Sequence, residues 1–127
     1  MKKEIAERWV SALRSGEYKQ GRLYLKSERG YCCLGVLCDI LGVEWAIDDR
    51  KIESYTVYEV KDGKDGKDGK IISTLPKEIM KKIGWSFSSI KDRLGYVGNQ
   101  FSLTALNDTG KSFDEIANVI EKHYQEL

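Results

Sequence analysis

The chain has 127 residues, the size of one domain, and its 21 basic and 20 acidic side chains leave a formal net charge of +1. That balance excludes a polycation of the histone or ribosomal type. Hydrophobic residues make up 41% and aromatic residues 10%, which excludes a fully disordered chain. No apolar run reaches the roughly 18 residues of a membrane helix, and the start of the chain lacks a signal-peptide core. We therefore expect a cytoplasmic protein without a membrane segment.

The first quarter of the chain predicts one helix and one short strand. Apolar residues at helical spacing predict a helix over 2–15, which Gly16 can end in a left-handed conformation. Residues 22–26 are expected to form a strand, and residues 27–30 are typical of a turn.

A glycine-containing apolar run follows. Its length and pattern favour a short buried helix over 33–41, ended by Gly42. Gly35 lies inside that helix, where glycine costs roughly 1 kcal/mol against alanine. We therefore expect Gly35 to permit close packing of another segment.

The middle of the chain carries the strongest strand signal. Residues 52–60 alternate between two faces. Lys-Asp-Gly then occurs three times over 61–69, and Asp-Gly pairs are typical of hairpin turns. We expect 52–60 and 70–74 to form a hairpin with 61–69 as its extended tip.

The last third is expected to be mostly helical. Pro76 begins a short helix that Gly84 ends. Residues 85–101 predict irregular structure with one short strand, and 102–107 a helical turn.

A capping box from Ser112 to Glu115 predicts the start of a terminal helix. Its expected buried residues are Phe113, Ile116, Ala117, Ile120 and Tyr124. Because helices and strands do not alternate regularly, we expect a single α+β domain over 1–127, with three or four helices and a small antiparallel sheet.

Three cysteines, Cys32, Cys33 and Cys38, lie in one apolar stretch. An odd number so close together is no disulfide framework, and core packing is the favoured interpretation. A zinc site lacks a fourth ligand, since His123 is the only histidine, and we expect His123 to be exposed or half-exposed. A nucleophilic cysteine with His123 as its base is the second alternative. We expect neither a metal nor a cofactor.

The N-terminal segment is the basic part of the chain. Residues 1–30 carry eight basic and four acidic side chains, a net charge of +4. Arg22 and Tyr24 would share one face of the expected strand, and arginine beside tyrosine suits a planar anion such as a nucleotide.

Two glycine-containing segments are further candidates for ligand binding, one over 95–100 and one over 107–110. Plain turns and a solvated strand face are the alternatives. The candidate ligand contacts are Gln20, Arg22, Tyr24, Tyr96, Asn99 and Asn107.

Four segments together resemble a group of small phage and prophage proteins. They read W-x-x-A-L-R-S-G-x-Y-x-Q from Trp9, Y-C-C-L-G-V-L-C-D from Tyr31, L-P at Leu75 and L-N-D-x-G-x-S-F-x-E-I-A from Leu106. The set spans nearly the whole chain and brings no catalytic residues with it. The Lys-Asp-Gly repeat looks like an insertion relative to that group.

The resemblance changes the expected function. Some phage proteins of this size sequester nucleotide-derived second messengers of bacterial immune systems, as the Thoeris anti-defence proteins do. The phage context and the size of the chain, taken with this resemblance, imply a non-enzymatic binder of a small anionic signal, such as a cyclic nucleotide or an ADP-ribose derivative. Such a protein would act in the host cytoplasm as a homo-oligomer.

Other functions stay open. An inhibitor or adaptor that binds a host protein is one alternative, and a small cysteine-dependent enzyme is another. Nucleic-acid binding is disfavoured because no recognised module is present.

Overall fold

The structure is a computed structural model that describes residues 1–63, 70–85, 96–97 and 101–127. The helices are α1 (Lys3–Arg14), α2 (Cys33–Ile40), α3 (Lys77–Ile83), α4 (Leu103–Asp108), α5 (Phe113–His123) and a terminal 3-10 turn η2 (Tyr124–Glu126). The strands form three antiparallel pairs: β1 (Lys26–Ser27) with β2 (Gly30–Tyr31), β3 (Trp45–Ile47) with β4 (Tyr58–Val60), and β5 (Tyr96–Val97) with β6 (Phe101–Ser102).

The expected α+β class is confirmed, although the described strands make three separate pairs rather than one sheet. Among the described residues, none of the helices combines the length and apolar composition needed to cross a membrane.

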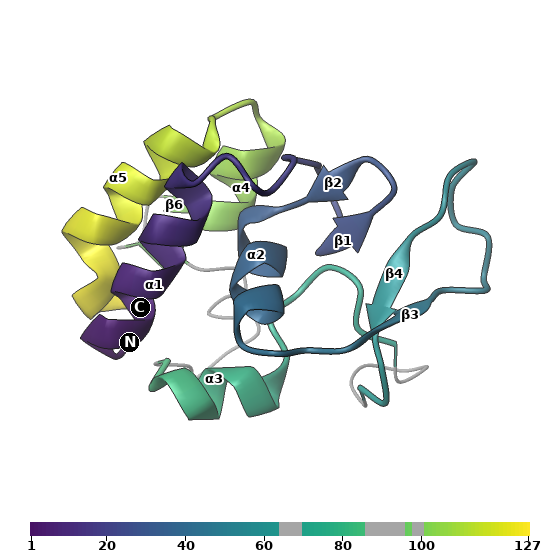
Figure 1. Ribbon diagram of the computed structural model, residues 1–127, viewed down its shortest axis with the longest axis horizontal. Helices are drawn as coiled ribbons and strands as arrows, with labels where there is room; N and C mark the ends of the chain where they lie inside the picture. Colours follow the sequence, from purple (N-terminus) through teal and green to yellow (C-terminus); the bar gives the residue numbers. More distant parts are fainter. Residues whose placement is uncertain (64–69, 86–95, 98–100) are drawn as a thin grey trace.

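Helices α1 and α5 lie side by side and bring the two ends of the chain together (Figure 1). Both are amphipathic and bury one face, as expected from their spacing. The cap of α5 is confirmed, since the Ser112 hydroxyl accepts the Glu115 N–H at 3.2 Å. Four of the five residues expected to be buried on the terminal helix are buried. The fifth, Tyr124, is half-buried and lies in η2 rather than in α5.

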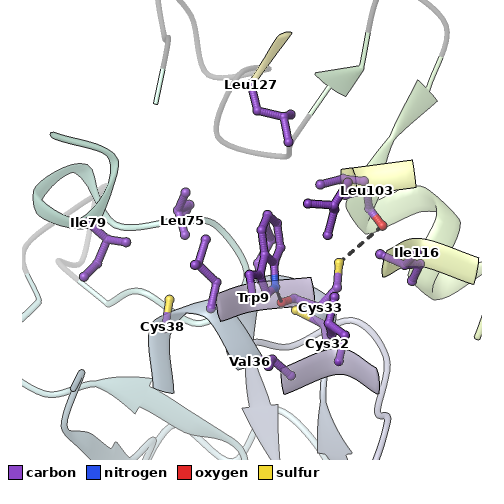
Figure 2. Close-up of a cluster of buried hydrophobic side chains, with 14 of the residues drawn as sticks. Trp9, Cys32, Cys33, Val36, Cys38, Leu75, Ile79, Leu103, Ile116 and Leu127 are labelled. Carbon is purple, nitrogen blue, oxygen red and sulfur yellow. Dashed lines mark hydrogen bonds between the residues drawn. The ribbon is translucent and has the colours of Figure 1, made fainter. Parts of the chain in front are cut away.

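The core surrounds α2. Figure 2 shows the Trp9 indole, which donates to the carbonyl oxygen of Cys33 at 2.9 Å, and the Cys33 thiol, which donates to that of Leu103 at 3.5 Å. All three cysteines are buried and free, so their core role is confirmed. Trp85 is also buried, with its ring 6.3 Å from that of Trp9.

Gly35 allows another segment to press directly on α2. A β-carbon at Gly35 would lie 1.7 Å from the carbonyl oxygen of Leu25, so no side chain fits there. The same carbonyl accepts the Cys32 N–H at 3.2 Å, and the Leu25 N–H donates to Ile72 at 2.7 Å. The expected close packing at Gly35 is therefore confirmed, and its neighbour is the segment before β1.

The strand expected over 22–26 is wrong. Only Lys26–Ser27 is a strand, because Leu23 has φ of +73° and a residue in the left-handed region cannot continue an extended chain. Arg22 and Tyr24 consequently do not share a face: Arg22 is exposed and Tyr24 is buried.

The strand expected over 52–60 is reduced to β4, and its strand partner is β3. The expected neighbour 70–74 contacts the end of β4 through one backbone bond, in which the Val60 N–H donates to the Ile71 carbonyl at 3.0 Å. Before β4, the backbone bonds to the turn between β1 and β2 instead: Thr56 accepts the Glu28 N–H at 2.9 Å and donates to the Glu28 carboxylate at 3.0 Å. Residues 64–69 of the repeat lie outside the described residues.

The remaining helices agree with expectation. α3 follows Pro76 and ends at Gly84, which has φ of +70°. The helical turn expected over 102–107 is α4, which is shifted by one residue, with Ser102 as its N-cap. The strand expected within 85–101 is β5, which pairs with β6, while 86–95 and 98–100 lie outside the described residues.

We predict that Gly35→Ala lowers the free energy of unfolding by about 3 kcal/mol or more, because its methyl group would overlap backbone that α2 already touches. Urea unfolding followed by tryptophan fluorescence measures it. Gly42→Ala is the control, since a β-carbon there meets nothing within 4 Å and only its φ of +84° is strained, at about 1 kcal/mol. Equal losses in the two variants would contradict the role of Gly35.

Candidate ligand-binding cleft

A cleft of about 460 Å³ lies where the segment before β1, the β1–β2 turn and the end of α4 meet. We call it the arginine cleft. It is lined by Gln20, Gly21, Arg22, Leu23, Arg29, Tyr55 and Asp108.

The wall at 20–21 is fixed by a buried amide. Asn107 is fully buried on α4, and its amide nitrogen donates to the carbonyl oxygen of Gly21 at 2.8 Å. The Gln20 amide nitrogen donates to the Asn107 side-chain oxygen at 2.9 Å and to the Lys111 carbonyl at 2.8 Å. The structure thus brings these two sequence-predicted residues together, and these amides bond within the protein to hold the wall on α4.

Backbone also packs directly on backbone beside this wall. A β-carbon at Gly30 would lie 2.4 Å from the Lys19 carbonyl oxygen, and one at Gly21 would lie 2.8 Å from the Gly30 carbonyl carbon. Tyr31 donates to Lys19 at 2.8 Å and accepts from Gly21 at 2.7 Å. These contacts hold the β1–β2 hairpin against the segment 19–21.

Arg29 and Tyr55 form a stack in the cleft. The guanidinium carbon of Arg29 lies 4.1 Å from the centre of the Tyr55 ring. The edge of that stack rests on Tyr24, whose ring centre is 6.5 Å from that of Tyr55 at an interplanar angle of 69°.

Tyr24, which packs against this stack, is held in place by Glu53. Its hydroxyl donates to the Glu53 carboxylate at 2.6 Å, and this bond, together with burial, raises the pKa of Tyr24 to about 12. The sequence predicted Tyr24 as a ligand contact, whereas the structure places it under Tyr55, which lines the cleft.

Arg22 and Arg29 supply the positive charge. Both side chains are exposed, and among the described residues neither guanidinium has a carboxylate within ion-pair distance. The acidic group in the wall is Asp108, whose Oδ1 accepts the Leu23 N–H at 2.9 Å and the Asn107 amide at 3.3 Å. As far as the structure describes the chain, the cleft therefore presents two cations without an ion-pair partner beside one carboxylate.

Two predicted contacts remain, Tyr96 and Asn99. Tyr96 lies in β5, opposite Ser102 in β6, and Asn99 lies outside the described residues. Sequence reasoning missed Tyr55 as a cleft residue, and it included Asp108 only as part of the candidate segment 107–110. Arg29 had a signal, since it is a turn residue in the basic N-terminal segment, but no local pattern links Tyr55 to it.

The cysteine alternative meets an electrostatic obstacle. Burial raises the pKa of Cys32 to about 12 and the pKa values of Cys33 and Cys38 well above their usual value, because a thiolate loses hydration in the core. The half-exposed His123, as expected, is at the surface, where its ring contacts Glu126. The described residues contain no group of three potential metal ligands.

Comparison with known families adds one finding. A family model described as a domain of unknown function, DUF8296, matches residues 1–124. The chain belongs to the DUF8296 family. Comparison with curated proteins and with solved structures found no match. The matched residues include every residue that lines the arginine cleft of this DUF8296 protein.

We predict that Asn107→Ala destabilises this DUF8296 domain by about 2 to 3 kcal/mol, because the substitution leaves the buried Gly21 carbonyl without its donor. Urea unfolding measures the loss. Asn118→Ala is the matched control: Asn118 is exposed and its side chain accepts a hydrogen bond from Arg14, so its removal should change stability by about 0.5 kcal/mol or less. A loss at Asn107 no larger than the control would contradict its structural role.

We also predict that the native protein resists alkylation of all three thiols at pH 8, since burial excludes the reagent and opposes the thiolate. Iodoacetamide labelling followed by mass measurement tests this, with urea-unfolded protein as the control that labels three times. Rapid labelling of any cysteine in the folded protein would revive the nucleophile alternative.

Proposed function

We propose that the protein is a non-enzymatic binder that sequesters a small, nucleotide-derived anion in the arginine cleft. The observation that carries this proposal is the pair of guanidinium groups, Arg22 and Arg29, which line one cleft without an ion-pair partner among the described residues.

The chemistry of the cleft suits phosphate next to an aromatic base. A guanidinium can bind phosphate through two parallel hydrogen bonds, and each charged bond contributes about 1.5 to 3 kcal/mol. The Arg29 guanidinium and the Tyr55 ring on which it stacks both line the cleft, and a base can stack on such planar groups. The volume of about 460 Å³ is in the range of small-molecule sites.

The cleft is also ordered before a ligand arrives. Arg29 already rests on Tyr55, which rests on Tyr24. Binding then costs less conformational entropy than it would for two free side chains. Preorganisation of this kind is what sequestration of a scarce signal requires.

The resemblance to small phage proteins supports an immune signal as the ligand, with cyclic nucleotides and ADP-ribose derivatives as the two classes. It also supports a homo-oligomer in the host cytoplasm. Trp9 and Trp85 are buried, so neither can supply a subunit interface, whereas Trp45 is half-buried.

The test is isothermal titration calorimetry with ADP-ribose and with 3′,5′-cyclic dinucleotides. We expect wild type to bind at least one of them, and Arg22→Ala and Arg29→Ala each to weaken binding about tenfold or more. Lys82→Ala is the control, because it removes one exposed positive charge on α3, outside the cleft.

Two results would overturn the proposal. One is the absence of heat with every nucleotide. The other is binding that the two arginine variants leave unchanged relative to Lys82→Ala. If no nucleotide binds, recovery of a host protein by the wild type would favour the alternative function, an inhibitor or adaptor that binds a host protein.

A further inference from the structure

A second, smaller cavity adjoins the arginine cleft. It has a volume of about 120 Å³ and is lined by Leu23, Cys32, Ser73, Thr104 and Asp108. Leu23 and Asp108 belong to the walls of both cavities, so the two meet at this pair of residues. We call the smaller cavity the hydroxyl pocket, after the side chains of Ser73 and Thr104.

Asp108 has one oxygen fixed and one available. Its Oδ1 accepts from the Leu23 backbone and from the Asn107 amide, which holds the carboxylate in one orientation. Its Oδ2 has no hydrogen-bond donor among the described residues, and neither has the Ser73 hydroxyl a partner there. A preoriented carboxylate oxygen and the Ser73 hydroxyl thus line the same small cavity, and neither has a hydrogen-bond partner in the described part of the chain.

We propose that this pocket binds the vicinal hydroxyl groups of a ribose, while the arginine cleft binds the phosphates of the same ligand. This inference rests on the proposed function and names its ligand class. A carboxylate accepts hydrogen bonds from neighbouring ribose hydroxyls, as acidic residues do in dinucleotide-binding sites. The same carboxylate repels a phosphate, so the phosphates would lie toward Arg22 and Arg29, the two cations that line the arginine cleft and not the hydroxyl pocket.

Size limits what can enter the hydroxyl pocket. Its volume of about 120 Å³ is far below that of the cleft and admits the edge of a sugar rather than a base or a whole nucleotide. The base then has to remain in the arginine cleft, where it can pack against the Arg29–Tyr55 stack.

The two ligand classes differ in the group that this pocket would recognise. ADP-ribose carries riboses with free 2′- and 3′-hydroxyls. In a 3′,5′-linked cyclic dinucleotide the 3′-oxygen is esterified, so no vicinal pair of hydroxyls exists, and the phosphodiester would lie against Asp108. The geometry favours the ADP-ribose class.

The experiment compares ADP-ribose with ADP-ribose that has been cleaved by periodate and reduced by borohydride. This treatment breaks the bond between vicinal hydroxyl-bearing carbons but leaves the base and both phosphates. We expect wild type to bind intact ADP-ribose about tenfold or more tightly than the cleaved form in calorimetry. We expect Asp108→Asn to remove most of that difference by weakening only the intact ligand.

Asp108→Asn keeps a side-chain oxygen for the Leu23 N–H, and urea unfolding checks that the variant is folded. Ser73→Ala is the second variant, with a smaller loss that is again confined to the intact ligand. Asp114→Asn is the charge control, because Asp114 is exposed in the first turn of α5 and lines neither cavity.

The outcomes separate the two proposals. Equal binding of intact and cleaved ADP-ribose, an equal effect of Asp108→Asn on both, or binding of a 3′,5′-cyclic dinucleotide but not of ADP-ribose would overturn the hydroxyl pocket alone. Absence of binding by every nucleotide would overturn the proposed function itself.

Discussion

The contact between Gly35 and the Leu25 carbonyl is the constraint on which the rest of the structure depends. It lets the segment before β1 cross α2 with backbone against backbone, at a distance that no β-carbon allows. The Leu25 carbonyl also accepts the N–H of Cys32, at the start of α2, so the crossing and the helix stabilise one another. Because this segment leads into the β1–β2 hairpin, the crossing sets where Arg22 and Arg29 can lie.

A buried polar network completes the placement. Asn107 is fully buried, and both ends of its side-chain amide are hydrogen-bonded: the nitrogen donates to the Gly21 carbonyl, and the oxygen accepts from the Gln20 amide. An unpaired buried amide is costly, so this network tolerates one arrangement of the chain and opposes others. The adjacent Asp108 accepts the Leu23 N–H and so helps to hold Leu23 at its positive φ. The walls of both cavities therefore follow from bonds that also stabilise the fold.

Local patterns predicted the helices well and the strands poorly. The start of α5 was predictable because Ser112 caps it by a bond three residues away. The start of β4 was not, because Thr56 bonds to Glu28, far away in the chain. In the cleft, Arg22 was predictable as a basic residue beside an aromatic one, although for the wrong reason, since the expected strand does not form. Tyr55 was not predictable, since it meets Arg29 only after folding.

The sequence by itself determined the α+β class, the positions of the helices, the core role of the cysteines and the close approach at Gly35. Each of these depends on periodicity, capping or residue size within a short stretch of chain. Only the tertiary structure decided that Gln20 and Asn107 bond to one another, that Tyr24 lies beneath Tyr55, and that Asp108 joins two cavities. These pairings link segments about 30 to 90 residues apart, and a pairing over such a distance is set by the packing of the whole core rather than by any local signal.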